Sequence, residues 1–248
     1  YKNYNNKENQ INEILWALNI TGYECKYSDP RFSKTYEYGI FREQYMTLEE
    51  YKKKYFDSSR PYTVGLLESN MYVSNGQLQP YYALIKALEA KGCNVIPVVA
   101  AGGSENQLKV MVKYFTNAPS YEAYLNNPLK YTNNVNAIIS MPAYGIGGNL
   151  FDNTTKYFET AGVPVFRAVH SDYVSNEEWE LSATGLPGNR SDKWWHVAIG
   201  EAQGIIEATF VGGVTHEISS KTGAHLSGFK AHEKNIDLFT KRIVSWIN

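Results

Sequence analysis

The chain has 248 residues, of which 43% are hydrophobic, enough to form the core of one α/β domain or of two small ones. Its 24 basic and 25 acidic residues are interspersed and give a formal net charge of −1, which disfavours binding to nucleic acid or to an anionic membrane. No apolar run approaches the roughly 20 residues that cross a bilayer, and the polar N-terminal segment lacks a signal-peptide core. These features predict a soluble, cytoplasmic protein without a membrane span.

The first 60 residues differ from the rest because tyrosine and asparagine are frequent in them. They contain one amphipathic helix, predicted over residues 7–19. A second, polar helix is expected to start after Thr47, whose side chain would form a capping box with Glu50, three residues on. We therefore expect residues 1–60 to form an α-rich, partly irregular appendage or lobe, followed by an α/β domain over residues 61–248.

From residue 61 onward, short apolar runs alternate with amphipathic helical patterns. Strands are predicted over residues 62–67, 95–100, 135–140, 163–169 and 196–199. Helices are predicted over residues 80–91, 105–115, 153–161, 176–182 and 236–247. Strands that alternate with helices at this rhythm indicate parallel βαβ units. We therefore predict an α/β fold with a doubly wound, mostly parallel sheet of the Rossmann or flavodoxin type.

Ligands bind such sheets beyond the carboxyl ends of the strands, where loops and helix N-termini converge. Four loops there are longer, or richer in glycine and polar groups, than a plain connection requires: residues 68–79, 101–105, 141–151 and 170–175. Candidates for ligand binding come from three of these loops and from the segment after the last predicted strand. They are Gly102, Gly103, Tyr144, Gly147, Gly148, His170, Ser171 and Glu201. The three loops are expected to face one shared cleft.

Each candidate also has a structural interpretation. The glycine-rich loop at Gly147 lacks the spacing of a dinucleotide fingerprint and the Lys-Ser or Lys-Thr pair of a P-loop, so a tight turn is favoured over a phosphate cradle. The backbone N–H groups of Gly102 and Gly103 could still hold a carboxylate at a helix N-terminus. His170 could bind a metal or move a proton, or it could make one hydrogen bond at the rim. Glu201 could equally anchor its own loop.

Catalytic residues cannot be assigned from the sequence, because no nucleophile–base pair or cofactor motif can be assembled. Two cysteines without metal-ligand spacing predict neither a disulfide framework nor a metal site. No cofactor is expected in this chain. Trp194 and Trp195 would place one ring inward and one outward if their segment were extended. The outward ring could stack on a flat ligand, although a core or subunit contact is favoured.

Several short motifs occur in an order that is characteristic of one family. They are LEAKG at residues 88–92, VIPV at 95–98, AGG at 101–103, GVPV at 162–165, EEW at 177–179 and GEAQG at 200–204. In these motifs the chain resembles the large subunit of the tetrapyrrole metal chelatases, a family that includes the large subunits of cobaltochelatase and of magnesium chelatase. The resemblance covers roughly residues 60–248.

The resemblance implies a module that binds or frames a porphyrin or corrin ring during ATP-dependent insertion of cobalt or magnesium. ATP would be hydrolysed by AAA+ ATPase-type subunits that act through the full-length protein. The family usually has Pro-Glu-Leu-Asp-Gly where this chain has GEAQG, and an Arg or His of the first loop is replaced around Asn70. The family's Gly-Thr-His-Gly or Gly-Lys-His-Gly segment lies downstream of the matched region. The resemblance therefore implies an internal fragment that is inactive alone.

Two other functions stay open. A stand-alone domain that binds a small metabolite would use the same strand-end loops and show a clear ligand cleft. A structural or subunit-docking module would instead show a large apolar surface.

Overall fold

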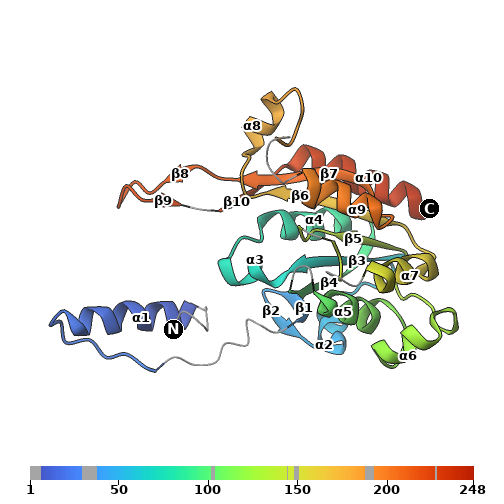
Figure 1. Ribbon diagram of the computed structural model, residues 1–248, viewed down its shortest axis with the longest axis horizontal. Coiled ribbons are helices and arrows are strands. Elements are labelled where there is room, and N and C mark those ends of the chain that lie inside the picture. Colours follow the sequence, from blue (N-terminus) through green and yellow to red (C-terminus); the bar gives the residue numbers. More distant parts are fainter. Residues whose placement is uncertain are drawn as a thin grey trace.

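Figure 1 shows the protein, a computed structural model, as a sheet with helices on both faces. The structure describes residues 7–29, 38–101, 104–143, 145–147, 151–187, 193–226 and 228–248. Within them the main sheet has eight strands: β1 (Gly39–Arg42), β2 (Gln44–Met46), β3 (Tyr62–Ser69), β4 (Cys93–Ala100), β5 (Ala137–Ser140), β6 (Val165–Ser171), β7 (Ile206–Val214) and β10 (Phe229–Ala231). A separate hairpin pairs β8 (Glu217–Ile218) with β9 (His225–Leu226).

The described helices vary widely in length. They are α1 (Lys7–Ile20), α2 (Leu48–Tyr55), α3 (Asn70–Asn75), α4 (Gln79–Ala90), α5 (Glu105–Phe115), α6 (Tyr121–Asn126), α7 (Phe151–Ala161), α8 (Asn176–Leu181), α9 (Ile199–Ala202) and α10 (Glu233–Ile247). A 3₁₀ turn, η2 (Pro128–Lys130), and a π-helix, η3 (Lys193–Ala198), complete the described elements.

The strand order across the sheet is β10-β7-β6-β5-β3-β4-β1-β2. The five strands β4, β3, β5, β6 and β7 are parallel neighbours, whereas β10 and β1 join antiparallel at the two sides. In chain order the parallel strands follow the 2-1-3-4-5 arrangement of flavodoxin-like sheets. The predicted α/β fold with a doubly wound, mostly parallel sheet is confirmed. The winding reverses between β3 and β5, which makes that position the topological switch point.

Helices cover the two faces of the sheet as separate layers. On one face α3, α4 and α10 pack against a core that contains Leu84 and Phe239. On the other face α2, α5, α6 and α7 pack around Met111 and Phe115. A third, much smaller cluster consists of Val169, Leu186 and Phe210, beside β6 and β7. That part of the sheet therefore carries the thinnest apolar cover.

Local signals in the sequence account for the position of several helices. The buried side chains of α4 recur at helical spacing, and the helix ends before Gly92, which adopts a φ of +80° that favours glycine. The capping box of α2 is confirmed, since the Thr47 hydroxyl accepts a hydrogen bond from the Glu50 N–H and Glu50 accepts one from the Thr47 N–H. Helix α5 has the bounds expected from the sequence.

The strand predicted over residues 196–199 is wrong. This segment forms η3, which continues directly into α9. A short apolar run is compatible with a strand or with a buried helix. Here the side chain of Arg167 donates hydrogen bonds to the carbonyl oxygens of Trp195 and His196, which would otherwise pair with a neighbouring strand. The strand that completes the parallel sheet is β7, just after this segment.

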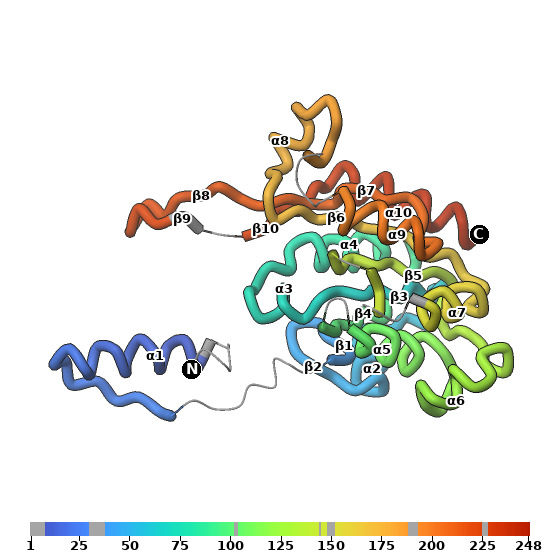
Figure 2. The backbone as a smooth tube through the Cα atoms, in the orientation of Figure 1, coloured from blue at the N-terminus to red at the C-terminus, as the bar shows by residue number. Residues whose placement is uncertain are grey.

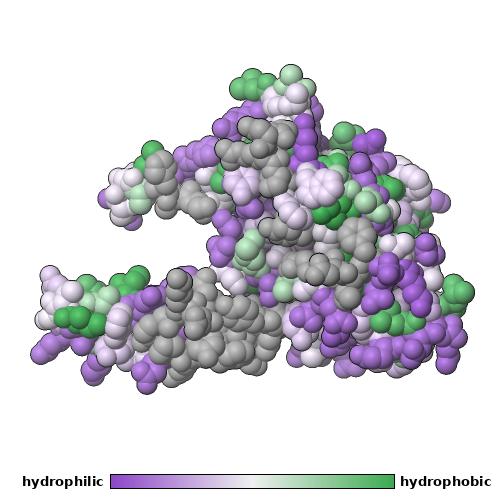
Figure 3. Space-filling view, viewed as in Figure 1, coloured by the Kyte–Doolittle hydropathy of each residue, from purple (hydrophilic) through white to green (hydrophobic). Residues whose placement is uncertain are grey.

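The N-terminal segment divides into two parts. Strands β1 and β2, which lie within residues 1–60, extend the sheet beyond β4. Helix α1 instead projects away from the sheet (Figure 2). Its side chains Ile14 and Trp16 are 62% and 42% exposed, and Figure 3 shows hydrophobic side chains on the surface of this projecting arm.

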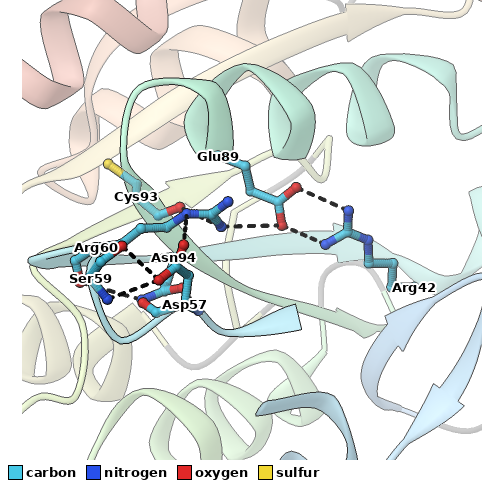
Figure 4. A network of polar contacts seen from close by, with 7 residues as sticks. All are labelled: Arg42, Asp57, Ser59, Arg60, Glu89, Cys93 and Asn94. Atoms are coloured by element: carbon cyan, nitrogen blue, oxygen red, sulfur yellow. Dashed lines mark hydrogen bonds and ion pairs between the residues drawn. The ribbon is translucent and has the colours of Figure 1, made fainter. Parts of the chain in front are cut away.

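A polar network fastens β1 to α4 (Figure 4). Both Nη atoms of Arg42 donate to the carboxylate of Glu89, at 2.6 and 3.0 Å, and Arg60 lies 3.9 Å from the same carboxylate. The Arg42 guanidinium also lies 4.1 Å from the centre of the Tyr55 ring. Burial alone would lower the pKa of Arg42, but the hydrogen bonds to Glu89 raise it above its ordinary value. The Arg42 guanidinium is therefore charged at neutral pH.

Replacing Arg42 by methionine is expected to lower the free energy of unfolding by about 1.5–3 kcal/mol, because a two-pronged charged contact is lost and Glu89 is left half-buried. Lys241, which pairs with Asp237 on the surface, is the control. Its replacement by methionine should cost at most about 0.5 kcal/mol. Urea denaturation measures both variants, and equal losses would contradict this role of Arg42.

Candidate functional site

The carboxyl ends of β3, β5 and β6 meet at one edge of the sheet, because these strands are parallel neighbours. Polar side chains gather there although the strands are buried. Glu68 lies near the end of β3, Ser140 ends β5, and His170 and Ser171 end β6. Flavodoxin-like sheets bind ligands at this edge, next to the switch point. We therefore take the carboxyl edge of β3, β5 and β6 as the candidate site.

Glu68 and His170 form a buried contact across this edge. The His170 Nε2 atom lies 3.1 Å from Oε2 of Glu68, an electrostatic contact without hydrogen-bond geometry, and both residues are at most 2% exposed. The other oxygen of Glu68 accepts the Ser69 N–H at 2.6 Å. Tyr72 meets the His170 ring edge-on and donates its hydroxyl to Asp172 at 3.1 Å. These contacts join the loop after β3 to the loop after β6.

Arg167 is a buried cation at the same edge, 1% exposed. Its Nη1 donates to the Ser140 hydroxyl at 2.9 Å, Nε to the His196 carbonyl at 2.7 Å, and Nη2 to the Trp195 carbonyl at 3.0 Å. Burial lowers the pKa of Arg167 to about 10, while Glu68 acts in the opposite direction. The guanidinium therefore stays charged at neutral pH and fixes η3 against the sheet.

His196 lies between these groups and is 3% exposed. Its ring centre lies 6.1 Å from that of His170, and its Nδ1 has no hydrogen-bond partner among the described residues. Burial lowers the pKa of His196 well below 6.5, and the nearby His170 and Arg167 lower it further. The His196 ring is therefore neutral in the folded protein at neutral pH.

Acid is expected to destabilise the protein through His196. The unfolded chain binds a proton at His196 near pH 6.5 and the folded chain does not, so the stability present above that pH is lost as the pH falls, by up to about 1.4 kcal/mol per unit. Urea denaturation at pH 7.0 and 5.5 should show a smaller loss for His196→Gln than for wild type. Trp194→Phe, at an exposed position of η3, is the control that keeps the titrating group. Identical losses in His196→Gln and wild type would refute this account.

The loop after β5 is held from three directions. The side chain of Gln203 accepts the Ile146 N–H at 3.0 Å and donates to the Ile146 carbonyl at 2.9 Å. Gln107 of α5 accepts the Gly147 N–H at 3.1 Å, and Thr154 of α7 donates to the Ile146 carbonyl. Gly147 has a φ of +77°, and a Cβ there would come within 2.6 Å of Thr154. The turn therefore requires glycine at this position.

The residues predicted as ligand-binding candidates fall into three groups. Gly102, Gly103, Tyr144 and Gly148 lie outside the described residues. Gly147, His170 and Ser171 lie at the carboxyl edge, where the Ser171 hydroxyl accepts the N–H groups of Tyr173 and Val174 and turns the chain after β6. Glu201 lies on α9 and is exposed. Ligand binding by all eight, and the shared cleft, stay predictions.

Four residues that organise this edge were not predicted from the sequence: Glu68, Arg167, His196 and Gln203. A signal was available for two of them. Arg167 lies inside the strand predicted over residues 163–169, and Glu68 directly follows the strand predicted over residues 62–67; charged residues are almost never fully buried unless they are paired. His196 lies in the segment that was predicted as a strand, and Gln203 had no local signal, because its contacts to Ile146 span 57 residues.

An apolar pocket of about 380 Å³ lies next to this edge, over β6 and β7. Its lining is apolar except for a lysine and a threonine: Val169, Trp179, Thr184, Leu186, Lys193, Val197, Ala198, Ala208 and Phe210. The Trp179 and Phe210 rings are stacked, with centres 4.8 Å apart and planes 4° from parallel. A volume of this size is in the range of small-molecule sites.

Neither a metal centre nor a membrane segment is found in the described part of the chain. No group of three or more potential metal ligands comes together there. No helix among the described residues is both long and apolar enough to cross a bilayer.

Comparison with known proteins points to one family. The model of the CobN/Magnesium Chelatase family matches residues 1–248. The uncharacterized protein MJ1441 of Methanocaldococcus jannaschii is 28% identical over 216 residues, which are 82% of this chain and 16% of that protein. The aerobic cobaltochelatase subunit CobN of Sinorhizobium sp. is 25% identical over 76% of this chain and 14% of its own length. The H-type subunit of the magnesium chelatase of Cereibacter sphaeroides is 26% identical over 65% of this chain and 12% of its own.

A solved structure shares the fold. The catalytic subunit of cobaltochelatase from Mycobacterium tuberculosis superposes with a TM-score of 0.62 and 13% identity, over 96% of this chain and 18% of that one. The chain thus spans less than a fifth of the length of these relatives. Because the family model covers every residue, the chain belongs to the CobN/magnesium chelatase family.

Proposed function

We propose that this chain is the part of a chelatase large subunit that binds or frames one side of a porphyrin or corrin ring during insertion of cobalt or magnesium. The observation that carries the proposal is the match of the whole chain to the CobN/magnesium chelatase family. The relatives named as chelatase subunits are several times longer than the segments that match, so the chain would supply one wall of a larger site.

The strand-end candidates enter this proposal as one group: Gly102, Gly103, Tyr144, Gly147, Gly148, His170, Ser171 and Glu201. His170 and Ser171 are buried, so their part is to hold the edge on which a ring rests. Backbone N–H groups at Gly102 and Gly103 would suit the carboxylates of a tetrapyrrole. Exposed Glu201 would suit a contact with the rest of the polypeptide.

Metal insertion requires work, because water must leave the ion and two protons must leave the ring. We assign ATP hydrolysis to separate AAA+ ATPase-type subunits, since this sequence has no P-loop. Cobalt or magnesium would arrive as substrate, and the chain would need no cofactor of its own. It would hold the ring and be inactive alone.

Ring binding and metal insertion are tested separately. The chain is titrated with metal-free mesoporphyrin IX and with a cobalt-free corrin, and fluorescence quenching of its five tryptophans is followed. Absorption spectra with Co²⁺ or Mg²⁺, with and without ATP, report insertion. We expect saturable binding of at least one ring and no insertion. Absence of binding would contradict the framing role, and insertion by the chain alone would contradict its inactivity. A flat anionic dye that is not a tetrapyrrole controls for unspecific stacking.

The exposed apolar side of α1 favours docking as a second function. Ile11, Ile14 and Ile20 are 48%, 62% and 64% exposed, an unusual cost for a helix in water unless another surface covers it. Removal of residues 1–29 separates the two functions. If the chain frames a ring, the shortened chain binds mesoporphyrin IX as tightly as the whole chain does.

A further inference from the structure

The apolar pocket beside the carboxyl edge exists because one crossover of the fold is irregular. The connections from β4 to β5 and from β5 to β6 each lay a long helix, α5 or α7, on the sheet. After β6 the chain leaves the sheet instead, forms the six-residue helix α8 and returns through η3 and α9 (Figures 1 and 2). The face formed by Val169, Ala208 and Phe210 therefore meets residues of α8 and η3 instead of one regular crossover helix, and it opens into the pocket.

The walls of this pocket suit a flat ring. Trp179 and Phe210 are stacked 4° from parallel and form one aromatic wall. Phe210 is buried beneath and Trp179 is half-buried, so the wall is fixed from below by the core. Flat aromatic groups gain dispersion and offset stacking on such a surface. Thr184 and Ala208 are exposed, so the pocket is open to solvent beside them. A ring too large for the pocket could therefore insert one edge there.

Charge narrows the class of ligand. Lys193 is the cation of the lining, and no carboxylate among the described residues forms an ion pair with it. The lining contains no acidic residue among those described. An ammonium group at the rim of an apolar pocket attracts an anion, and the contact is stronger where water is partly excluded. The pocket is thus complementary to an apolar ring with an anionic substituent.

A second part of the lining comes from one helical element that the protein itself holds in place. Lys193, Val197 and Ala198 come from η3, and π-helices are rare elements that occur frequently at functional sites. Arg167 holds this element through the carbonyl groups of Trp195 and His196. A buried charged side chain that binds two backbone carbonyls of one short helix fixes its position, which lowers the entropy lost on binding.

We propose that this pocket receives the edge of a flat aromatic ring that carries carboxylates, with the ring stacked beside Trp179 and one carboxylate on Lys193. The inference rests on the proposed function, in which that ring is the tetrapyrrole. It assigns the contact to the outer face of β6 and β7 and to residues of the irregular crossover.

The test compares metal-free mesoporphyrin IX, which has two carboxylates, with its dimethyl ester, using the whole chain and tryptophan quenching. Ala208→Phe narrows the pocket from an exposed position and is expected to weaken binding of both rings at least about tenfold. Lys193→Met is expected to weaken binding of the acid about three- to tenfold and to leave the ester unchanged. Ala90→Phe and Lys221→Met, exposed and not part of the lining, are matched controls expected to bind as wild type does.

The outcomes separate the two proposals. If wild type binds mesoporphyrin IX and both pocket variants bind it equally well, the ring lies elsewhere and the pocket assignment is overturned, while the framing role stands. If Lys193→Met weakens the acid and the ester alike, the charge contact is overturned. If the wild type binds neither ring, both the framing role and the assignment of the ring to this pocket are contradicted. Circular dichroism and urea denaturation of each variant show whether a loss of binding reflects a loss of folding.

Discussion

Replacing Arg167 by methionine is expected to lower the free energy of unfolding by about 3–5 kcal/mol, a large part of the stability of an ordinary domain. The substitution leaves the Trp195 and His196 carbonyls and the Ser140 hydroxyl without their buried donor. It also removes the cation that faces buried Glu68. Each buried polar group that loses its partner costs about 1–3 kcal/mol. Urea denaturation followed by circular dichroism measures the change.

Two further substitutions show whether the loss comes from this geometry. Ser140→Ala removes one of the Arg167 partners named above and is expected to cost about 1 kcal/mol. Arg167→Lys keeps the charge but cannot reach three acceptors at once, so it should lie between Ser140→Ala and Arg167→Met. If Arg167→Met and Ser140→Ala cost the same, Arg167 does not hold η3 as described. Because η3 forms a wall of the pocket, Arg167→Lys should also weaken binding of mesoporphyrin IX.

Replacing Gly213 by alanine is expected to cost about 3 kcal/mol or more. Gly213 lies near the end of β7, where the chain before α8 passes directly over it. A Cβ there would lie 2.1 Å from the Val174 carbonyl oxygen and 3.0 Å from backbone atoms of Ser175. The obstacle is backbone, which cannot rotate away as a flexible side chain does, so the strand or the loop must move.

Gly228 provides the matched control. It directly precedes β10, which pairs with the end of β7, and a Cβ there would lie 3.4 Å from the Thr215 hydroxyl. Gly228→Ala is expected to cost less than about 1 kcal/mol. In thermal unfolding, the midpoint temperature of Gly213→Ala should therefore be much lower than that of Gly228→Ala. Similar midpoints would contradict this prediction, because they would show that the backbone near Val174 can move away from an added Cβ at little cost.

The sequence predicted the sheet because its central strands are short, apolar and separated by helical patterns. Strands β3 to β6 and helices α4, α5 and α7 follow from that alternation. Strand β7 was not predicted, because Gly212 and Gly213 weaken the strand pattern. In the structure these glycines are what allows Pro80 and the chain at Val174 to approach the strand. The two glycines that weakened the strand pattern in the sequence are thus required for tertiary packing.

The sequence predicted where the candidate site lies better than it predicted which side chains form it. Strand ends and glycine loops can be recognised locally, which placed His170 and Gly147 at the carboxyl edge. The contact between Glu68 and His170 joins residues far apart in the sequence and depends on strand order, which no local pattern encodes. The pocket likewise combines Trp179 with Lys193 and Phe210 through an irregular crossover. The π-helix η3 was read as a strand because its apolar spacing fits both.

A map of backbone amides perturbed by metal-free mesoporphyrin IX in the ¹⁵N-labelled chain tests the framing role most directly. We expect saturable shifts for amides around Val169, Lys193 and Phe210 and for the indole N–H of Trp179. Amides of α1 and of the β8–β9 hairpin should stay unchanged. Shifts confined to α1 would indicate unspecific binding to its exposed apolar side chains, and no shifts at all would mean that this chain does not frame the ring. Either result would contradict the proposal that this chain frames the ring.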